Sequence, residues 1–190
     1  RCAYNDHTFA QLQAETGWLR ETMGDTAVSI LSAEQVAAET GATDFVGGML
    51  NTHGGVIHPL NFVFGIAKGL HAAGVDIFEQ TPVLRFRRDG AGVLVETPHG
   101  TVTAKQVVIA TNSYSDLTSA TAAVKTSIIP FRSAMIATEP LAGTAGARLL
   151  PTGRSYTETR RMMRWFRKSG DRLLYGGRGA FGKADSESAF

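Results

Sequence analysis

The sequence contains a single cysteine, Cys2, among its 190 residues. One cysteine excludes an intramolecular disulfide and a cysteine-based zinc cluster, and it is typical of proteins kept in a reducing compartment. No run of residues approaches the roughly 20 apolar positions that a membrane span requires. We therefore expect a cytoplasmic protein with no metal site and no membrane partner.

An excess of charge of one sign is also missing. The sequence has 19 Lys and Arg against 17 Asp and Glu, for a net charge of +2. This balance gives no overall attraction to nucleic acid. Residues 160–168 concentrate basic side chains between Met and aromatic residues. This pattern is compatible with a surface on which nucleic-acid bases stack, or with a β-strand that has one solvent-exposed face. We favour the strand and expect no nucleic-acid partner.

The phosphate-binding turn G-x-G-x-x-G is absent as well. This turn brings backbone N–H groups and a helix terminus to a dinucleotide pyrophosphate. Residues 47–48 and 54–55 are glycine pairs without a third glycine, and the glycine-rich residues 176–179 open no evident helix. We interpret these glycines as turns and caps.

Residues 54–115 carry the clearest pattern of secondary structure. A helix is predicted from His58 to Gly74, because Pro59 suits the first helical position and glycine suits a left-handed cap. A short strand is predicted at 75–79, and the apolar run at 107–110 is typical of a parallel strand covered on both faces. Turn residues separate three further β-rich segments, at 83–88, 93–97 and 101–104.

Two capping patterns predict further helices near the start of the chain. Thr8 begins a helix that ends at Gly24, and Ser32 begins a shorter helix that ends at Gly41. The helix after Pro59 is apolar on several faces, which predicts burial on several sides. In this chain alone, some of that surface is expected to be exposed and to promote oligomerisation or poor solubility.

The order of these elements, with the words IHP at 57–59, VDIFE at 75–79 and VVIATNSYS at 107–115, resembles the D-amino-acid-oxidase-like superfamily of FAD-dependent oxidoreductases. Within it, the gamma-glutamylputrescine oxidase-like branch fits best. Residues 128–141 and 161–177 resemble strands of that family's substrate domain, so the resemblance covers nearly the whole chain. Members carry the phosphate motif near the N-terminus and a second flavin-contacting segment near the C-terminus. The resemblance therefore implies a central portion that lacks both.

The implied fold is mixed α+β and α/β. It combines part of an FAD-binding Rossmann-like domain, with parallel strands and a β-hairpin insert, and an antiparallel-sheet substrate domain. The domains are expected to be discontinuous in sequence. Residues 1–55 would be the helical first part of the substrate domain, residues 56–115 a portion of the FAD-binding domain, and residues 116–190 the antiparallel second part of the substrate domain.

FAD is the cofactor that the resemblance implies. In the family, backbone groups of the strand that begins after an E-x-T-x-V pattern contact the adenine end of FAD. The pattern lies at residues 79–83 here and implicates Val83. The alternative is that Val83 is an ordinary residue of a β-ladder. Ala110, Thr111 and Asn112 match a segment that runs past the pyrophosphate and ribitol. Their place at the carboxyl end of a predicted strand also suits a ligand, while a plain polar turn is the alternative.

The implied function is oxidation of a C–N bond in a small amine or amino acid, with hydride transfer to the flavin and hydrolysis of the imine. His58 is a weak catalytic candidate, because an ordinary pKa of about 6.5 would help it select a neutral amine; a helix cap is the alternative. Strand side chains alternate in direction, so only some of the substrate-wall candidates can face a cavity. These candidates are His53, Arg132, Arg164 and Trp165.

Two other functions stay open at this point. One is a non-enzymatic β-rich module that binds a substrate or a partner, since fold does not fix function. The other is the flavin domain of an RNA-modifying enzyme, which the balanced charge disfavours. We favour the amine or amino-acid oxidoreductase and expect this portion to be inactive alone.

Overall fold

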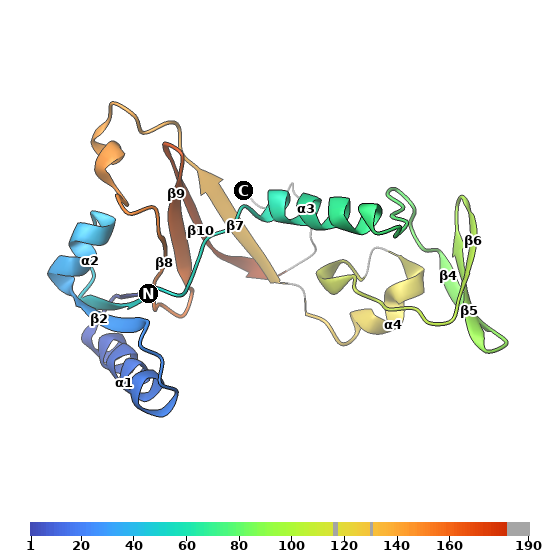
Figure 1. The fold of residues 1–190 in the computed structure, drawn as a ribbon, viewed down its shortest axis with the longest axis horizontal. Helices are drawn as coiled ribbons and strands as arrows, with labels where there is room; N and C mark the ends of the chain where they lie inside the picture. Colours follow the sequence, from blue (N-terminus) through green and yellow to red (C-terminus); the bar gives the residue numbers. More distant parts are fainter. Residues whose placement is uncertain (116–117, 130, 182–190) are drawn as a thin grey trace. The chain divides into compact units, whose positions relative to one another are not determined.

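A computed structural model describes residues 1–115, 118–129 and 131–181 (Figure 1). The chain divides into two compact units. The first unit comprises Arg1–Ile57 and Ser133–Gly179, and the second contains His58–Arg132. None of the helices in these described ranges is both long and apolar enough to cross a bilayer.

The first unit contains two helices and two antiparallel sheets. One sheet has the order β1-β3-β2 and the other the order β7-β10-β9-β8. A single parallel bridge between Cys2 and Glu158 joins β1 of the first sheet to the residue that follows β8. The elements are β1 (Cys2–Ala3), α1 (Asp6–Thr22), β2 (Val28–Ser32), α2 (Ala33–Thr40), β3 (Gly47–Asn51), β7 (Phe131–Ala137), β8 (Ser155–Thr157), β9 (Arg164–Ser169) and β10 (Arg172–Phe181), with a 3-10 turn at Ala145–Arg148.

The two helices cover opposite faces of the sheet that contains β3. Successive residues of a strand point to opposite faces. A Cβ added at Gly47 would meet the ring of Phe9 from α1, whereas one at Gly48 would meet Val36 from α2. Two small cores result. One contains Ala3, Leu12 and Met49, and the other contains Cys2, Val36, Leu150 and Tyr156.

The helix predictions hold with one correction. α2 has the predicted capping box at Ser32 and a left-handed Gly41, with φ 80°. α1 begins at Asp6, because the side chain of Asn5 accepts the N–H of Thr8 and caps the helix. The predicted start at Thr8 was wrong: an Asn lies three residues before it and is an equally strong cap.

The second unit consists of α3, a β-hairpin sheet and short helical turns. α3 spans Pro59–Ala72, and the predicted cap at His58 is confirmed. The β-rich insert forms an antiparallel sheet of order β4-β5-β6. Its strands are β4 (Arg85–Asp89), which starts two residues later than predicted, β5 (Gly92–Thr97) and β6 (Gly100–Ala104), and they are followed by η1 (Asn112–Tyr114), η2 (Ser119–Thr121) and α4 (Ala122–Lys125).

The strands predicted at 75–79 and 107–110 are not formed. Both segments are irregular, because no strand of the described residues lies beside them to complete a ladder. Their apolar side chains are exposed, up to 88% for Val108, as are those of α3. The exposed apolar residues of these segments are Leu60, Phe62, Val63, Phe64, Ile66, Leu70, Val75, Ile77, Phe78, Val107, Val108 and Ile109.

Replacement of Gly48 by alanine is expected to destabilise the first unit by about 2 kcal/mol, because the new Cβ would lie 2.7 Å from the backbone oxygen of Arg1. The matched control is Gly17→Ala in α1, where a Cβ meets nothing within 4 Å. The control should stabilise by about 0.5 kcal/mol, since alanine is the better helix former. Urea unfolding followed by tryptophan fluorescence measures both, because Trp18 and Trp165 are the only tryptophans of the sequence and lie in the first unit. Equal effects of the two substitutions would contradict the close approach of β1 to β3.

Candidate functional site

Val83 lies just before β4 rather than within it. The first hydrogen bond to β5 is made by Leu84, whose N–H donates to the carbonyl of Glu96 at 2.8 Å. The N–H and C=O groups of Val83 have no partner among the described residues. Val83 is therefore not a ladder residue of the sheet formed by β4, β5 and β6, and its contact with a cofactor stays a prediction.

Thr111 and Asn112 form a sharp turn after the irregular segment 107–110. Thr111 has right-handed helical backbone angles, with φ −83° and ψ −4°, and Asn112 has a positive φ of 46°. A right-handed residue followed by a left-handed one aims successive backbone N–H groups into one concavity, which suits an anion. The N–H groups of Thr111, Asn112 and Ser113 have no hydrogen-bond partner in the described part of the chain.

Hydrogen bonds of the buried Ser115 side chain hold this turn in place. This side chain is 2% exposed, and its hydroxyl donates to the carbonyl of Asn112 at 2.7 Å. The hydroxyl of Thr111 lies 2.7 Å from the same Ser115 oxygen. Thr121 in turn donates its hydroxyl to the carbonyl of Ser115. The sequence analysis missed Ser115, because a buried serine differs from an exposed one only through its tertiary contacts.

The same network joins the turn to the segment that contains Val83. η2 carries both Thr121, which bonds Ser115, and Ser119, whose hydroxyl donates to the carbonyl of Leu84 at 3.3 Å. Both cofactor candidates predicted from the sequence are therefore anchored to one short element of the second unit. Ala110 stays exposed at the start of the turn.

The two histidine candidates have local backbone roles. Nδ1 of His58 accepts the N–H of Asn61 at 3.3 Å and caps α3. His53 is exposed, and its N–H donates to the side chain of Asn51 at 2.8 Å. The helix-cap interpretation of His58 is thus correct, and its catalytic role stays a prediction. Among the residues that the structure describes, no group of three or more His, Cys, Asp and Glu is placed to bind a metal.

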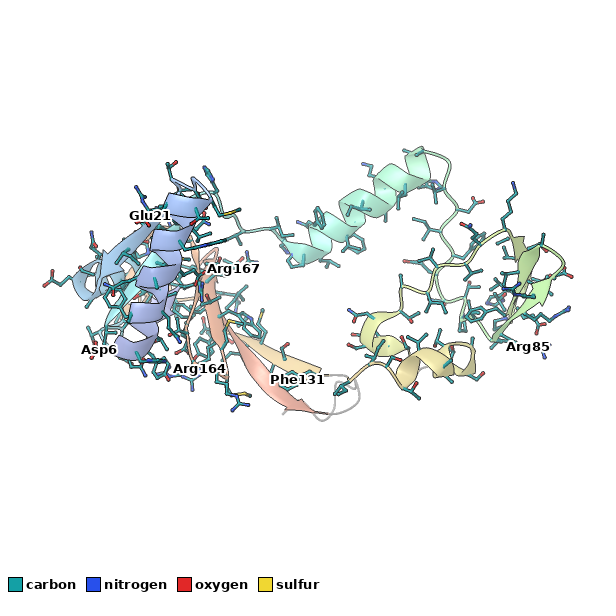
Figure 2. The ribbon with its side chains drawn as sticks, turned by 90° about the horizontal axis from the view of Figure 1, so that it is seen from below. Asp6, Glu21, Arg85, Phe131, Arg164 and Arg167 are labelled. Atoms are coloured by element: carbon teal, nitrogen blue, oxygen red, sulfur yellow. The ribbon has the colours of Figure 1, made fainter. Side chains whose placement is uncertain are left out.

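Arg164 and Trp165 are neighbours in β9 and therefore point to opposite faces of the sheet (Figure 2 labels Arg164). Nε of Arg164 lies 3.4 Å from the buried carboxylate of Glu158. Trp165 is half-buried, and a Cβ on Gly176 would lie 2.2 Å from its indole nitrogen, so the indole lies directly on β10. At most one of the two can face a given cavity. The backbone of Arg132 belongs to β7, and its side chain lies outside the described part of the structure.

A cavity of about 570 Å³ lies within the first unit and includes none of the predicted substrate residues. Its polar rim contains Glu39, whose carboxylate pairs with Arg154 and accepts hydrogen bonds from Thr152 and Tyr156 at 3.0 Å each. The hydrogen bond from Arg154 lowers the pKa of Glu39, and burial raises the pKa of the Tyr156 hydroxyl. Burial likewise raises the pKa of the Cys2 thiol at the base of the cavity.

Comparison with known proteins identifies the family. Residues 1–189 match the DAO family, described as FAD dependent oxidoreductase. The chain belongs to this family. The family is FAD-dependent, so the resemblance and the cofactor predicted from the sequence are both confirmed.

Curated relatives are considerably longer than the chain. The "Probable oxidoreductase OrdL" of Rhizobium meliloti (strain 1021) is 36% identical over 156 residues, which are 81% of this chain and 35% of that protein. The gamma-glutamylputrescine oxidoreductase of Escherichia coli (strain K12) is 30% identical over 187 residues, 97% of this chain and 43% of that protein. The chain thus spans less than half the length of these DAO-family relatives.

Two crystal structures share the fold. Glycine oxidase from Geobacillus kaustophilus has a TM-score of 0.73 at 20% identity, over 97% of this chain and 48% of that one. L-proline dehydrogenase from P. horikoshii has a TM-score of 0.74 at 17% identity, over 98% of this chain and 49% of that one. The likeness confirms the mixed α/β architecture with antiparallel sheets.

The lowered pKa of Glu39 predicts a pH-dependent stability of the first unit. A carboxyl whose folded pKa lies below its ordinary value of 4.5 stabilises the fold above that pH, and the contribution is lost as the pH falls through the folded pKa. Glu39→Gln should therefore lower the free energy of unfolding by about 1 kcal/mol near pH 7, a modest value because Arg154 is partly exposed. The difference should shrink as the pH falls below 4.5.

The control is Glu21→Gln, an exposed glutamate at the end of α1 (Figure 2). Urea unfolding at several pH values should give the same curve for this variant as for the wild type. A pH-independent loss in Glu39→Gln would show that packing rather than ionisation is responsible.

Proposed function

We propose that the chain is the central portion of an FAD-dependent enzyme that oxidises a C–N bond of an amine or amino acid. The observation that carries the proposal is the turn at residues 111–113, where three adjacent N–H groups have no partner among the residues that the structure describes. Membership of the DAO family supports the cofactor. The substrate class is supported by the relatives, which include gamma-glutamylputrescine oxidoreductase and proteins named glycine oxidase.

The second unit would form part of the FAD-binding domain. The concavity formed by Thr111, Asn112 and Ser113 has the donors that a pyrophosphate requires, so these residues fit the cofactor. The free backbone groups of Val83 can pair with an adenine edge as a neighbouring strand would, whatever the side chain. Ser115 and Thr121 would hold the concavity in shape before the cofactor arrives.

The first unit would supply the substrate wall. When bound, the flavin supplies the acceptor for a hydride equivalent from the carbon next to nitrogen. The residues of the chain would then bind the amine, orient its C–H bond and exclude water. Glu158 holds Arg164 at one edge of β9, where the rest of its guanidinium fork remains available to a substrate carboxylate.

The exposed apolar residues of the second unit support the proposal that further segments of the enzyme cover it. A parallel sheet needs strands on both sides of an apolar run, and segments 75–79 and 107–110 have none among the described residues. Relatives more than twice as long contain enough chain to provide them. We also propose a cytoplasmic location, consistent with the lone cysteine.

The flavin proposal predicts a specific pattern in an extended protein that includes the residues flanking this chain in its gene. Such a protein should retain FAD, seen in its visible spectrum after removal of free cofactor. Asn112→Val should weaken FAD binding about tenfold, because a β-branched residue is strained at the positive φ of Asn112. Asn112→Gly should bind nearly as tightly as the wild type, since glycine adopts this conformation freely.

Two outcomes would contradict different parts of the proposal. Failure of the extended wild-type protein to retain flavin would reject the flavoenzyme function. Retention with equal affinity in both Asn112 variants would keep the flavoenzyme but reject the turn at 111–113 as the phosphate site.

The exposed apolar surface predicts that the chain alone binds a hydrophobic dye such as ANS and forms oligomers. Val108→Lys should reduce dye fluorescence, because Val108 is the most exposed of these side chains. Thr103→Lys, on the neighbouring hairpin, is the control and should leave the signal unchanged. A compact monomer without dye binding, by light scattering and fluorescence, would count against uncovered surface in the second unit.

A further inference from the structure

The turn between β8 and β9 carries one buried carboxylate and two arginines that pair with it. The side chain of Glu158 is 3% exposed. Its carboxylate accepts a hydrogen bond from Nη1 of Arg160 and lies 3.4 Å from Nε of Arg164. The two arginines contact different oxygens of the carboxylate, Oε2 and Oε1, so Glu158 holds both guanidinium groups at once.

The register of the hairpin brings Glu158 and Arg164 together. Thr157 lies opposite Trp165, and the N–H of Glu158 donates to the carbonyl of Arg164 at 3.0 Å. Glu158 and Arg164 are therefore the next cross-strand pair, and side chains that lie opposite each other share one face of the sheet. Residues 159–163 form the loop that this pair closes.

Arg160 is held by the residues around α1. Its guanidinium carbon lies 5.1 Å from the centroid of the Tyr4 ring, a distance typical of a cation–π contact. Thr159, next to it, donates its N–H to the carbonyl of Cys2 at 3.1 Å and its hydroxyl to that of Thr8 at 2.8 Å. Both arginines thus have fixed positions, which reduces the ordering cost of binding a ligand.

The cluster has more positive charge than its buried carboxylate requires. One cation is sufficient to pair with a buried carboxylate. Two guanidinium groups and one carboxylate give a net charge of +1. In the part of the chain that the structure describes, neither arginine has an ion pair with any other carboxylate. Folding of the unit accounts for one arginine, and the charge of the second is left for a ligand.

Both arginines also have donors to offer. A guanidinium has five N–H donors in a planar fork. Arg160 uses Nη1 and Arg164 uses Nε for Glu158, so Nη2 of Arg160 and both Nη groups of Arg164 have no partner among the described residues. The two side chains are 38% and 49% exposed. Planar forks of this kind match the two oxygens of a carboxylate.

We propose that Arg160 and Arg164 together bind a carboxylate group of the substrate, with Glu158 as their positioning residue. The source of the carboxylate rests on the function proposed above. The inference narrows the substrate class to amino acids and other amines that carry a carboxylate, rather than simple alkylamines. The substrate would bind on the face of β9 that carries Arg164, so Trp165, on the opposite face, would not contact it.

The test measures how fast phenylglyoxal modifies each arginine, by mass spectrometry of peptides from the whole chain. Sodium acetate should slow modification of Arg160 and Arg164 about threefold or more, because it occupies their donors. Acetamide, which has the same shape without the charge, and sodium chloride at equal ionic strength should not. Arg172 pairs with the exposed Glu139 and is the internal control, whose rate should not change.

A variant tests whether the two arginines act together. Arg164→Gln should abolish the protection of Arg160 by acetate, because Glu158 then neutralises the one guanidinium that remains. The buried carboxylate keeps a partner in this variant, so the unit should fold, as circular dichroism would show. Arg164→Lys keeps the charge without the fork and should give weaker protection than the wild type. Arg172→Gln is the matched control and should retain full protection.

Three results would overturn the inference. Equal protection by acetate and by chloride would show charge screening instead of a carboxylate site. Full protection of Arg160 in Arg164→Gln would show that the pair does not act together. Protection by a hexaglutamate peptide at concentrations at which acetate has no effect would assign the arginines to an acidic polypeptide instead of a substrate. None of these measurements involves flavin, so failure of this inference is distinguishable from failure of the proposed function.

Discussion

The first unit depends on the pairing of β1 with strands from both halves of the chain. Cys2 and Ala3 are almost completely buried, at 3% and 0% exposure. Their neighbours on one side come from β3 and on the other from Glu158 and Thr159. Thr159 adds a side-chain link, because its hydroxyl donates to that of Thr8 in α1 at 2.8 Å. One short strand thus holds an N-terminal sheet and a C-terminal sheet together, and both helices pack around that junction.

Contacts of this kind leave little local trace in a sequence. The cap of α2 and the start of α3 were predictable, because Ser32 and Pro59 act on backbone groups within a few residues. The bridge from Cys2 to Glu158 joins residues far apart along the chain, and no local sequence pattern near either residue predicts it. The cavity beside β1 escaped prediction for the same reason, since its walls come from two distant strands.

The candidate site shows the same division. The family resemblance selected residues 110–112 and Val83 as cofactor candidates, because both belong to recognisable sequence words of the family, and their contacts with a cofactor stay predictions. It did not predict that Asn112 adopts a positive φ, nor that Ser115 is buried beneath it. The sequence did predict that only some of the substrate-wall candidates can face one cavity, and the alternation of β9 places Arg164 and Trp165 on opposite faces of the sheet. Residue type suggests chemistry, whereas side-chain direction depends on strand register.

The second unit combines an ordered polar turn with irregular apolar segments. Its polar turn is shaped by internal hydrogen bonds from Ser115 and Thr121, which need no other segment. Its apolar runs are different. Residues 107–110 have the composition of a β-strand, yet they are irregular, because a β-ladder requires a neighbouring strand. Hydrogen bonds between residues close in sequence form as soon as the local chain is ordered, while burial of an apolar strand requires the whole sheet. An ordered polar turn beside an unformed strand follows from that difference in range.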